Sequence, residues 1–325
     1  TMPQAPGTPG SLAERTYADI VAFLLQANGA QPGTEALTAA TDPVIGRIAD
    51  GVMPNTVRQA ATVAVPSAAN VSGFLGLTIE GAIEDLSPVT DEMLRNPDPD
   101  DWLMLRGNYE AWSYSPLNDI NRGNVGELRL QWAWSLTEGG RNEPAPIVHD
   151  GILYVVNMAN LVQALDAATG TLLWENYLGP NIASGAMRGL AIYGDKLYVN
   201  TNDARMVALE AATGKVVWDT TIGERTEGGY ANSSGPIVVK GKVISGLAAC
   251  AQYRNEKCFI SAYDTETGEE AWRFTTIAQD LEPGGDTWGE IENFYRAGGE
   301  TWITGSYDPV LDLTYWGVAQ AKPWM

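Results

Sequence analysis

The chain has 325 residues, a length that suits one large domain or two modest ones. Its 20 Lys and Arg residues stand against 40 Asp and Glu residues, and the net charge of −20 argues against binding to nucleic acid or to an anionic membrane surface, because both need clustered cations. The single histidine, His149, excludes a multi-histidine metal site and argues against a Ser/His/Asp triad. No apolar run reaches the roughly 18 residues of a membrane span.

The first predicted element is a helix over residues 11–29. Its opening letters, SLAE, have the spacing of a capping box, and Gly29 is a suitable residue to end the helix. Residues 31–100 are rich in Ala, Thr and Pro with weak periodicity, which indicates a linker. A short apolar segment inside it, residues 71–83, is expected to dock on a neighbouring element.

From residue 101 onward the composition changes, and all eleven tryptophans lie in this part. Three segments, PIVHDGILYVVN, GLAIYGDKLYVNT and SGPIVVKGKVISG, each place two apolar runs around a short turn that contains glycine. This arrangement predicts three β-hairpins. His149 lies in the first of these turns, where we expect a solvated residue rather than a catalytic one.

A repeat joins the hairpins. The segments ALDAATGTLLW (164–174), ALEAATGKVVW (208–218) and AYDTETGEEAW (262–272) share an acidic residue, a Thr-Gly turn and a Trp four residues after the Gly. Successive Trp residues are 44 and 54 positions apart, a period typical of a β-propeller. We therefore predict an all-β fold of four-stranded propeller blades, with each repeat Trp packed between adjacent blades.

The two cysteines, Cys250 and Cys258, stand in the stretch CAQYRNEKC. Their spacing excludes the C-x-x-C pair of a zinc site or a thioredoxin-type motif. Two interpretations stay open, a local disulfide that closes a short loop and a pair of unrelated buried thiols. A disulfide would imply an oxidising compartment.

Several motifs together resemble the PQQ-dependent quinoprotein alcohol dehydrogenases. They are the D-A-x-T-G-x-x-x-W blades, WSYSPLNDINRGNV at 112–125, GGDTWG at 284–289 and TWITGSYDPVLDLTYWG at 301–317, and the likeness covers about residues 91–325. The resemblance implies an eight-bladed propeller that holds pyrroloquinoline quinone (PQQ) and a Ca²⁺ or lanthanide ion near its axis. It also implies that the quinone takes hydride from an alcohol and passes electrons to a cytochrome c.

The resemblance implies four cofactor-binding residues. Glu143 falls where the family has a cofactor-contacting glutamate, and Arg188 falls where an arginine holds the quinone oxygens, a role that suits its fork of donors. Ser233 falls at a hydroxyl that contacts the cofactor. Trp302 falls at the indole that forms one wall around the quinone, although another packing residue between blades is an alternative interpretation.

The chain departs from the family at the metal. The family's metal-binding Glu falls at Ala251, with Gln252 beside it, and its metal-binding Asn falls at Gln320. Gln320 and Gln252 are therefore the candidate metal ligands, although a hard cation prefers charged oxygens. The vicinal cysteine pair of the family falls at Ile182 and Ala183. Either the loop between the two cysteines repositions the ligands or metal binding is altered.

The N-terminal residues 1–30 resemble the final helix of a c-type cytochrome, with Met2 where an axial methionine could stand. The Cys and His residues that attach haem are absent, so haem c would belong to a longer parent protein; an ordinary amphipathic helix is the alternative. Residues 101–325 suffice for about four to five blades of the eight. We expect a fragment of a quinoprotein–cytochrome fusion, or else a second chain that supplies the remaining blades.

The resulting functional hypothesis is a periplasmic or secreted oxidoreductase that moves hydride from a small alcohol to PQQ and electrons to a cytochrome c. The family's catalytic aspartate is expected beyond residue 325. The alternative is a non-catalytic propeller that serves as a binding or assembly scaffold, because the metal-binding Glu and the vicinal cysteines are missing. Convergence of Arg188 and Trp302 on one site separates the two hypotheses. A glycosidase is a distant third, since no carboxylate pair stands out.

Overall fold

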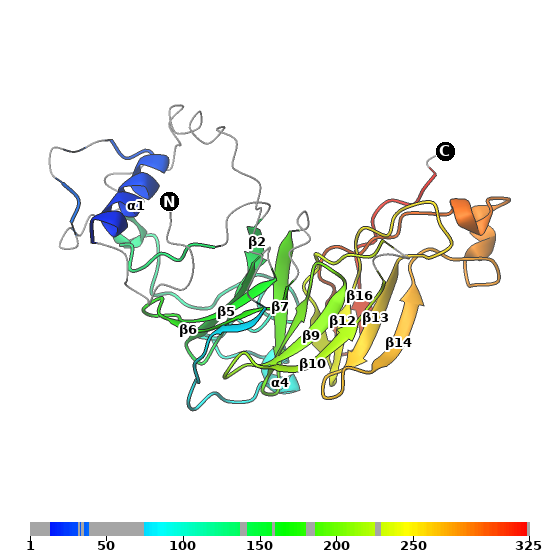
Figure 1. The fold of residues 1–325 in the computed structure, drawn as a ribbon, viewed down its shortest axis with the longest axis horizontal. Helices are drawn as coiled ribbons and strands as arrows, with labels where there is room; N and C mark the ends of the chain where they lie inside the picture. The colour runs from blue at the N-terminus through cyan, green and yellow to red at the C-terminus, as the bar shows by residue number, and fades with distance from the viewer. Residues whose placement is uncertain are drawn as a thin grey trace. The chain divides into compact units, whose positions relative to one another are not determined.

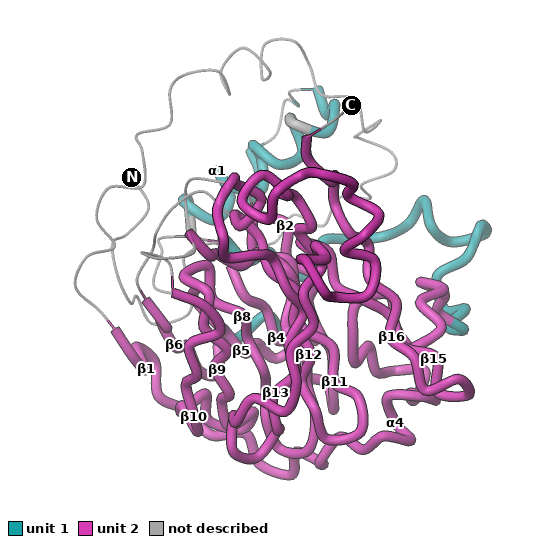
Figure 2. The backbone as a smooth tube through the Cα atoms, turned by 90° about the vertical axis from the view of Figure 1, so that its right-hand side faces the viewer, with its two compact units in different colours: residues 1–69, 116–135, 169–171 teal, residues 70–115, 136–168, 172–325 magenta. Residues whose placement is uncertain are grey.

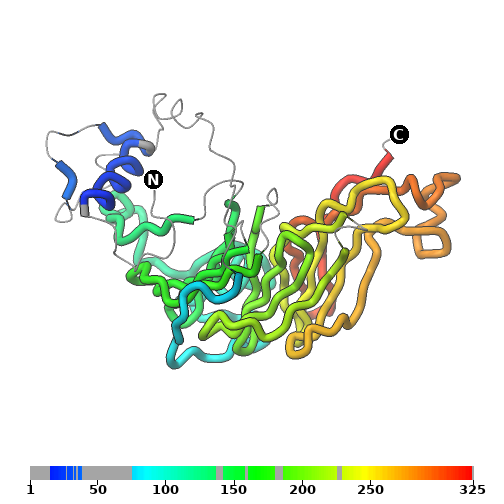
Figure 3. Tube along the Cα trace, in the orientation of Figure 1, coloured from blue at the N-terminus to red at the C-terminus, as the bar shows by residue number. Residues whose placement is uncertain are grey.

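The computed structural model divides into two compact units (Figure 2). The first unit comprises residues 1–69, 116–135 and 169–171, and the second comprises residues 70–115, 136–168 and 172–325. From residue 147 onward, the chain of the second unit runs from one sheet to the next in sequence order (Figure 3). The structure describes residues 14–31, 33, 36–38, 75–136, 142–157, 160–179, 186–224 and 229–323.

The first unit contains the predicted N-terminal helix, α1 (Glu14–Ala27), and the short 3₁₀ helix η1 (Val125–Glu127). Gly29 ends α1 with a φ of 93°, and the N–H of Ala30 bonds to the carbonyl of Leu25 at 3.0 Å. This is the glycine stop that the sequence predicts. The capping box at the start of the helix lies outside the described residues. None of the helices in the described part of the chain is long and apolar enough to cross a membrane.

The second unit is built from successive antiparallel sheets (Figure 1). The first contains β3 (Ile147–His149), β4 (Ile152–Asn157), β5 (Leu161–Asp166) and β6 (Leu172–Tyr177). The second contains β7 (Met187–Tyr193), β8 (Lys196–Asn200), β9 (Arg205–Glu210) and β10 (Val216–Thr221). The third contains β11 (Ile237–Val239), β12 (Lys242–Ser245), β13 (Phe259–Asp264) and β14 (Glu270–Thr275). A two-stranded sheet follows, β15 (Ser306–Asp308) and β16 (Leu313–Tyr315).

The prediction of an all-β partial propeller is confirmed. Among the described residues there are three complete four-stranded blades and the first hairpin of another, fewer than the four to five that the length suggested. The difference arises because the described residues between 101 and β3 form no blade of their own. The only strand among them, β2 (Asn142–Ala145), joins the second blade in parallel with β7. The other helices in the described ranges are short: α4 (Asp91–Arg95), η2 (Gly285–Trp288) and η3 (Asn293–Tyr295).

The three predicted hairpins are also confirmed. Asp150 and Gly151 both have positive φ, 49° and 74°, between β3 and β4, and Lys240 and Gly241 have φ of 48° and 69° between β11 and β12. Two consecutive left-handed residues make a type I′ turn, whose twist matches that of the flanking strands. The third hairpin turns at Gly194, with φ 59°.

Two of the three repeat tryptophans, Trp174 and Trp218, join neighbouring blades as predicted. Trp174 on β6 is fully buried against Gly214, and its indole N–H donates to the carbonyl of Ala211 at 3.0 Å. Trp218 on β10 packs on Gly268 in the same way, and its N–H donates to Thr265 at 3.0 Å. In both pairs the acceptor lies three residues before the glycine. Each tryptophan therefore covers the Thr-Gly turn of the next blade. A side chain on the glycine of that turn would overlap the indole ring.

Two further tryptophans mark the ends of this series. In the first unit Trp132 lies against Gly170, so a Cβ built on that glycine would be 2.6 Å from the ring. Trp272 on β14 is 38% exposed, and no glycine turn of the described residues covers it. The third blade thus leaves exposed the tryptophan of its last strand, β14, at the position where the first two blades have a tryptophan covered by the next blade.

Residues 75–100, the described end of the expected linker, form part of the second unit. β1 (Gly76–Ile79) pairs antiparallel with β6 and extends the first blade, in agreement with the docking expected for the apolar segment. Val89 and Leu94 are each 2% exposed in the core. Their apolar side chains are buried against the blades, which a linker would leave in water.

His149 is likewise different from the solvated residue that its turn suggested. The ring is fully buried, with Nδ1 at 3.0 Å from Oδ2 of Asp101 and Nε2 at 2.8 Å from the carbonyl oxygen of Ser87. Asp150 accepts hydrogen bonds from the N–H and the hydroxyl of Ser87. His149 therefore ties the segment before the blades to the β3–β4 turn.

Candidate functional site

The site is organised around Arg188, on β7. The parallel pairing of β2 with β7 matches Asn142 with Met187 and Ala145 with Gly189, which brings Glu143 beside Arg188. Oε2 of Glu143 lies 2.9 Å from Nη2 of Arg188. β2 precedes the first blade in the sequence but pairs with β7 of the second blade. The ion pair between Glu143 and Arg188 therefore depends on this pairing.

Two glycines let the inner strands of neighbouring blades approach closely at this point. A Cβ on Gly235, just before β11, would lie 3.2 Å from Cα of Gly189 and 2.9 Å from Oγ1 of Thr304. The Thr304 hydroxyl donates to the carbonyl of Gly235 at 2.8 Å. Only glycine permits this contact. It fixes the segments that carry Ser233 and Trp302 next to Arg188.

Ser233 and Trp302 complete the group. Nη1 of Arg188 donates to the backbone carbonyl of Ser233 at 3.3 Å, so the contact uses the carbonyl and not the hydroxyl that the resemblance implied. The guanidinium carbon of Arg188 lies 4.8 Å from the centre of the Trp302 ring, within cation–π range. The other three predicted cofactor residues, each from a separate segment, therefore contact the guanidinium of Arg188.

A cavity of about 220 Å³ adjoins Trp302. We call it the Trp302 cavity, and its other lining residues are Ala251, Glu300, Ala319, Gln320 and Lys322. Gln320, one predicted metal ligand, is thus part of the cavity wall. Gln252, the other, is exposed and accepts a hydrogen bond from Arg254, and it is not among the residues that line the cavity. Its neighbour Ala251 lines the cavity instead.

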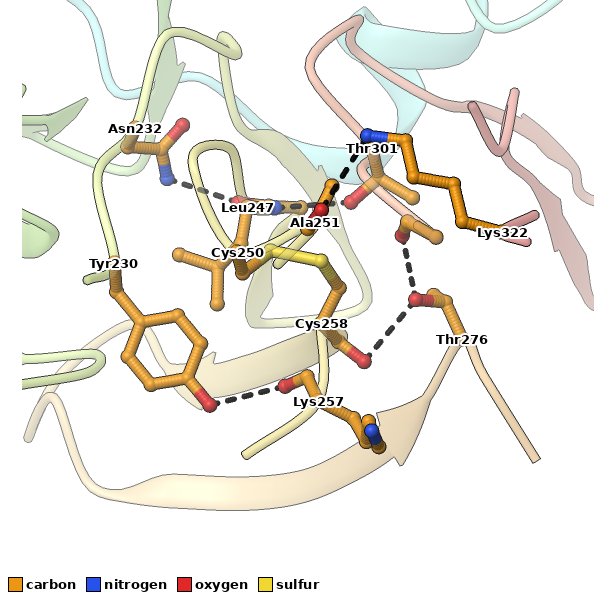
Figure 4. The surroundings of a disulfide bond; sticks show 12 residues. Tyr230, Asn232, Leu247, Cys250, Ala251, Lys257, Cys258, Thr276, Thr301 and Lys322 are labelled. Carbon is orange, nitrogen blue, oxygen red and sulfur yellow. Dashed lines mark hydrogen bonds between the residues drawn. A yellow bond between two sulfur atoms is a disulfide. The ribbon is translucent and has the colours of Figure 1, made fainter. Parts of the chain in front are cut away.

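Thr301 holds the segment that carries Glu300 and Trp302. It exchanges hydrogen bonds with Leu247, since its N–H donates to the Leu247 carbonyl at 2.9 Å and its hydroxyl accepts from the Leu247 N–H at 2.9 Å (Figure 4). A Cβ on Gly246 would lie 2.2 Å from the Thr301 hydroxyl. This close packing fixes Glu300 and Trp302 at the cavity wall.

The disulfide is present, between Cys250 and Cys258, and it closes the loop that carries Ala251 (Figure 4). The adjacent Lys257 is buried, and its ammonium donates to three backbone carbonyls, those of Arg254, Asn293 and Arg296. Burial lowers the pKa of Lys257, and the nearby Arg296 lowers it further. The disulfide and Lys257 together fix the loop at the edge of the Trp302 cavity.

Comparisons with known proteins identify the family. The family model for the glucose/ethanol/alcohol dehydrogenase β-propeller domain, PQQ, matches residues 102–324. The chain belongs to this PQQ family.

Its relatives include the quinohemoprotein alcohol dehydrogenase ADH IIB of Pseudomonas putida, 37% identical over 69% of this chain and 34% of that protein. Another is the dehydrogenase subunit of the quinone alcohol dehydrogenase of Gluconobacter oxydans, 34% identical over 70% of this chain and 33% of that subunit. The solved structure of ADHIIG from Pseudomonas putida HK5 superimposes with a TM-score of 0.65 at 31% identity, over 74% of this chain and 37% of that one. The chain thus spans about a third of the length of the curated relatives.

Within the PQQ family, the metal is the feature that this site fits least. Ca²⁺ takes six to eight oxygen ligands, usually with several carboxylates. The Trp302 cavity offers one carboxylate, Glu300, and one amide, Gln320, beside the ammonium of Lys322. In the described part of the chain, three His, Cys, Asp or Glu side chains come close enough to share an ion only at Asp101, His149 and Asp150, away from this cavity. Both nitrogens of that histidine already face oxygen acceptors.

Sequence reasoning missed Glu300 and Lys322. Neither lies in a motif that marks a site, and the resemblance assigns a role to neither. The only available signal was proximity in the sequence, since Glu300 lies two positions before Trp302 and Lys322 two positions after Gln320, and residues close to a site residue often share its wall. Glu300 has no ion pair or side-chain hydrogen bond among the described residues, so the carboxylate is available to a ligand.

Proposed function

We propose that this chain forms the quinone-binding part of a PQQ-dependent alcohol dehydrogenase. The observation that carries the proposal is the convergence of Glu143, Arg188, Ser233 and Trp302 in one place, from segments up to 159 residues apart. A scaffold without a cofactor has no need to bring an arginine and an indole together beside a cavity. The missing metal ligand at Ala251 favours such a scaffold, but the convergence outweighs it.

Each residue has a distinct task in this proposal. Bound PQQ would supply the quinone that accepts hydride from a small alcohol and releases the electrons to a cytochrome c. Trp302 offers an aromatic face on which a planar ring system stacks. Arg188 presents a planar fork of N–H donors to quinone oxygens, and Glu143 and the Ser233 carbonyl hold that fork in place.

The wider assembly is part of the proposal. The exposed Trp272 supports further blades, supplied by the same chain or by another. Residues 1–30 are proposed as the end of a cytochrome c-like domain whose haem c belongs to a longer parent, with α1 as the support for a helix there. The disulfide and the net charge of −20 support a periplasmic or secreted location and the steering of a basic cytochrome c.

The test is a titration of the purified chain with PQQ, in which binding is measured by the quenching of tryptophan fluorescence and by the absorbance of the quinone. Arg188→Gln and Trp302→Leu are each expected to weaken PQQ binding by about tenfold or more, since each removes a charged donor or the stacking face. Arg122→Gln, at an exposed position, serves as the control and should bind as the wild type does. Absence of PQQ binding, or equal binding by all variants, would contradict the proposal.

A further inference from the structure

The second unit has another pocket, of about 440 Å³, which shares no lining residue with the Trp302 cavity. We call it the tyrosine pocket. Three segments form its wall, and the lining residues are Tyr253, Glu290, Ile291, Glu292, Tyr295 and Pro323. The wall therefore combines aromatic and aliphatic surface with two carboxylates.

The two tyrosines form the aromatic part of the wall. The ring centres of Tyr253 and Tyr295 are 6.2 Å apart with an angle of 61° between the ring planes, and Phe294 packs on Tyr295 with ring centres 5.2 Å apart. Tyr253 is 49% exposed and Tyr295 is 52% exposed, so about half of each residue remains open to a ligand. The face of an aromatic ring carries partial negative charge and attracts a cation that lies within about 6 Å of the ring centre.

The carboxylates of Glu290 and Glu292 add full negative charges to this wall. Both residues are exposed, and neither side chain has an ion pair or a hydrogen bond within the described part of the chain. Among the described residues that line the pocket there is no Lys or Arg. The two charges therefore favour a positive ligand over a neutral ligand of the same shape.

Buried cations hold the backbone of this wall in place. Arg296 is 2% exposed, and its Nε donates to the carbonyl of Ile291 at 2.8 Å. The ammonium of Lys257 donates to the carbonyls of Asn293 and Arg296. Lys257 is also adjacent to the disulfide that closes the loop carrying Tyr253 (Figure 4). Lys257 thus ties two segments of the wall together, and a preformed pocket loses less free energy in ordering when a ligand binds.

We propose that the tyrosine pocket binds a small organic cation that carries a quaternary ammonium group. Such a group forms no hydrogen bonds, and its methyl groups pack on aromatic rings while its charge interacts with the rings and the carboxylates. A metal ion such as Ca²⁺ needs six to eight oxygen ligands, more than two carboxylates supply. The inference does not depend on the proposed function, because none of these lining residues belongs to the Trp302 cavity.

The first experiment compares two ligands of the same shape. The full chain, without added PQQ, is titrated with choline and with the neutral alcohol in which carbon replaces the nitrogen of choline, and the NMR signal of the ligand methyl groups measures binding. Choline should bind about tenfold more tightly than the neutral alcohol, and high salt should weaken only the binding of choline. Equal affinities for the two ligands, or no binding of choline, would overturn the proposal.

The second experiment places the ligand in the pocket. Tyr295→Leu should weaken choline binding by about fivefold or more, and so should Glu290→Gln combined with Glu292→Gln, whereas binding of the neutral alcohol should change little. Tyr315→Leu, at a residue that is 50% exposed, and Glu269→Gln, at another exposed position, are matched controls outside the pocket and should bind choline as the wild type does. Circular dichroism confirms that each variant is folded. Choline affinity that is the same in the folded pocket variants and in the wild type would refute this site.

Discussion

The packing of tryptophan on glycine can be tested with two glycines that share a backbone conformation and differ in their surroundings. Gly214 has a φ of 70° and Gly151 has a φ of 74°, so alanine at either position adopts a left-handed conformation that costs about 1–2 kcal/mol. A Cβ on Gly151 meets nothing within 4 Å. A Cβ on Gly214 would lie 2.4 Å from Cε3 of Trp174, far inside van der Waals contact.

Trp174 cannot easily move away, because it is fully buried and bonded to Ala211. Overpacking of this kind costs about a further 1–3 kcal/mol. Gly214→Ala should therefore lower the free energy of unfolding by about 2–5 kcal/mol and Gly151→Ala by about 1–2 kcal/mol. Urea unfolding followed by tryptophan fluorescence measures both. Equal losses for the two variants would refute the idea that the Trp174 contact, rather than the turn itself, demands glycine.

Three further predictions concern the third blade. Replacement of both Cys250 and Cys258 by Ser should lower the free energy of unfolding by about 2–3 kcal/mol, because the unfolded chain regains the conformational entropy that the closed loop had removed. Urea unfolding measures this loss, and an unchanged free energy of unfolding would contradict the prediction. Asp264 accepts the backbone N–H groups of Thr267 and Glu266, in that order of effect, which holds its pKa below the ordinary value of 3.8. The ionised Asp264 carboxylate therefore stabilises the fold fully above about pH 3.8, and this contribution is lost as the pH falls through the lower pKa of the folded state. The loss of stability caused by Asp264→Asn, measured by urea unfolding, should therefore vanish in acid. A loss that does not depend on pH would refute this. Trp272→Ala should cost at most about 1 kcal/mol, whereas Trp174→Ala costs about 3–5 kcal/mol; similar losses in urea unfolding would show that Trp272 is already packed.

Much of the fold was predictable because its signals are local. A turn such as Asp150-Gly151 requires two positive φ angles, and a few letters of sequence reveal that requirement. The Thr-Gly turns and their tryptophans are just as visible, because the same spacing recurs in each blade. The contacts that sequence reasoning missed join distant segments. β1 pairs with β6 about 97 residues later, and His149 is buried by Asp101 and Ser87, which lie 48 and 62 positions before it.

The site shows the same division. Arg188 and Trp302 were predicted from motifs, and the structure places them together. The pairing of Ala251 with Lys322 spans 71 residues and could not be inferred from either segment alone. Nor does a sequence specify that Ser233 meets Arg188 through its carbonyl, since that depends on the backbone direction just before β11. A motif specifies which residue types are present, and the close approach of glycine-bearing strands decides which atoms meet.

Blade packing and site geometry are coupled in this architecture. Arg188 belongs to the second blade, Ser233 leads into the third, and Trp302 leads into the hairpin that follows. The distance between the second and third blades is set on one side by Trp218 on Gly268 and on the other by the contact of Gly189 with Gly235. A change at the tryptophan tilts one blade against the next, and the inner strands can follow only by separating Arg188 from the Ser233 carbonyl. Damage to a packing tryptophan should therefore weaken quinone binding even though no packing tryptophan lines the cavity.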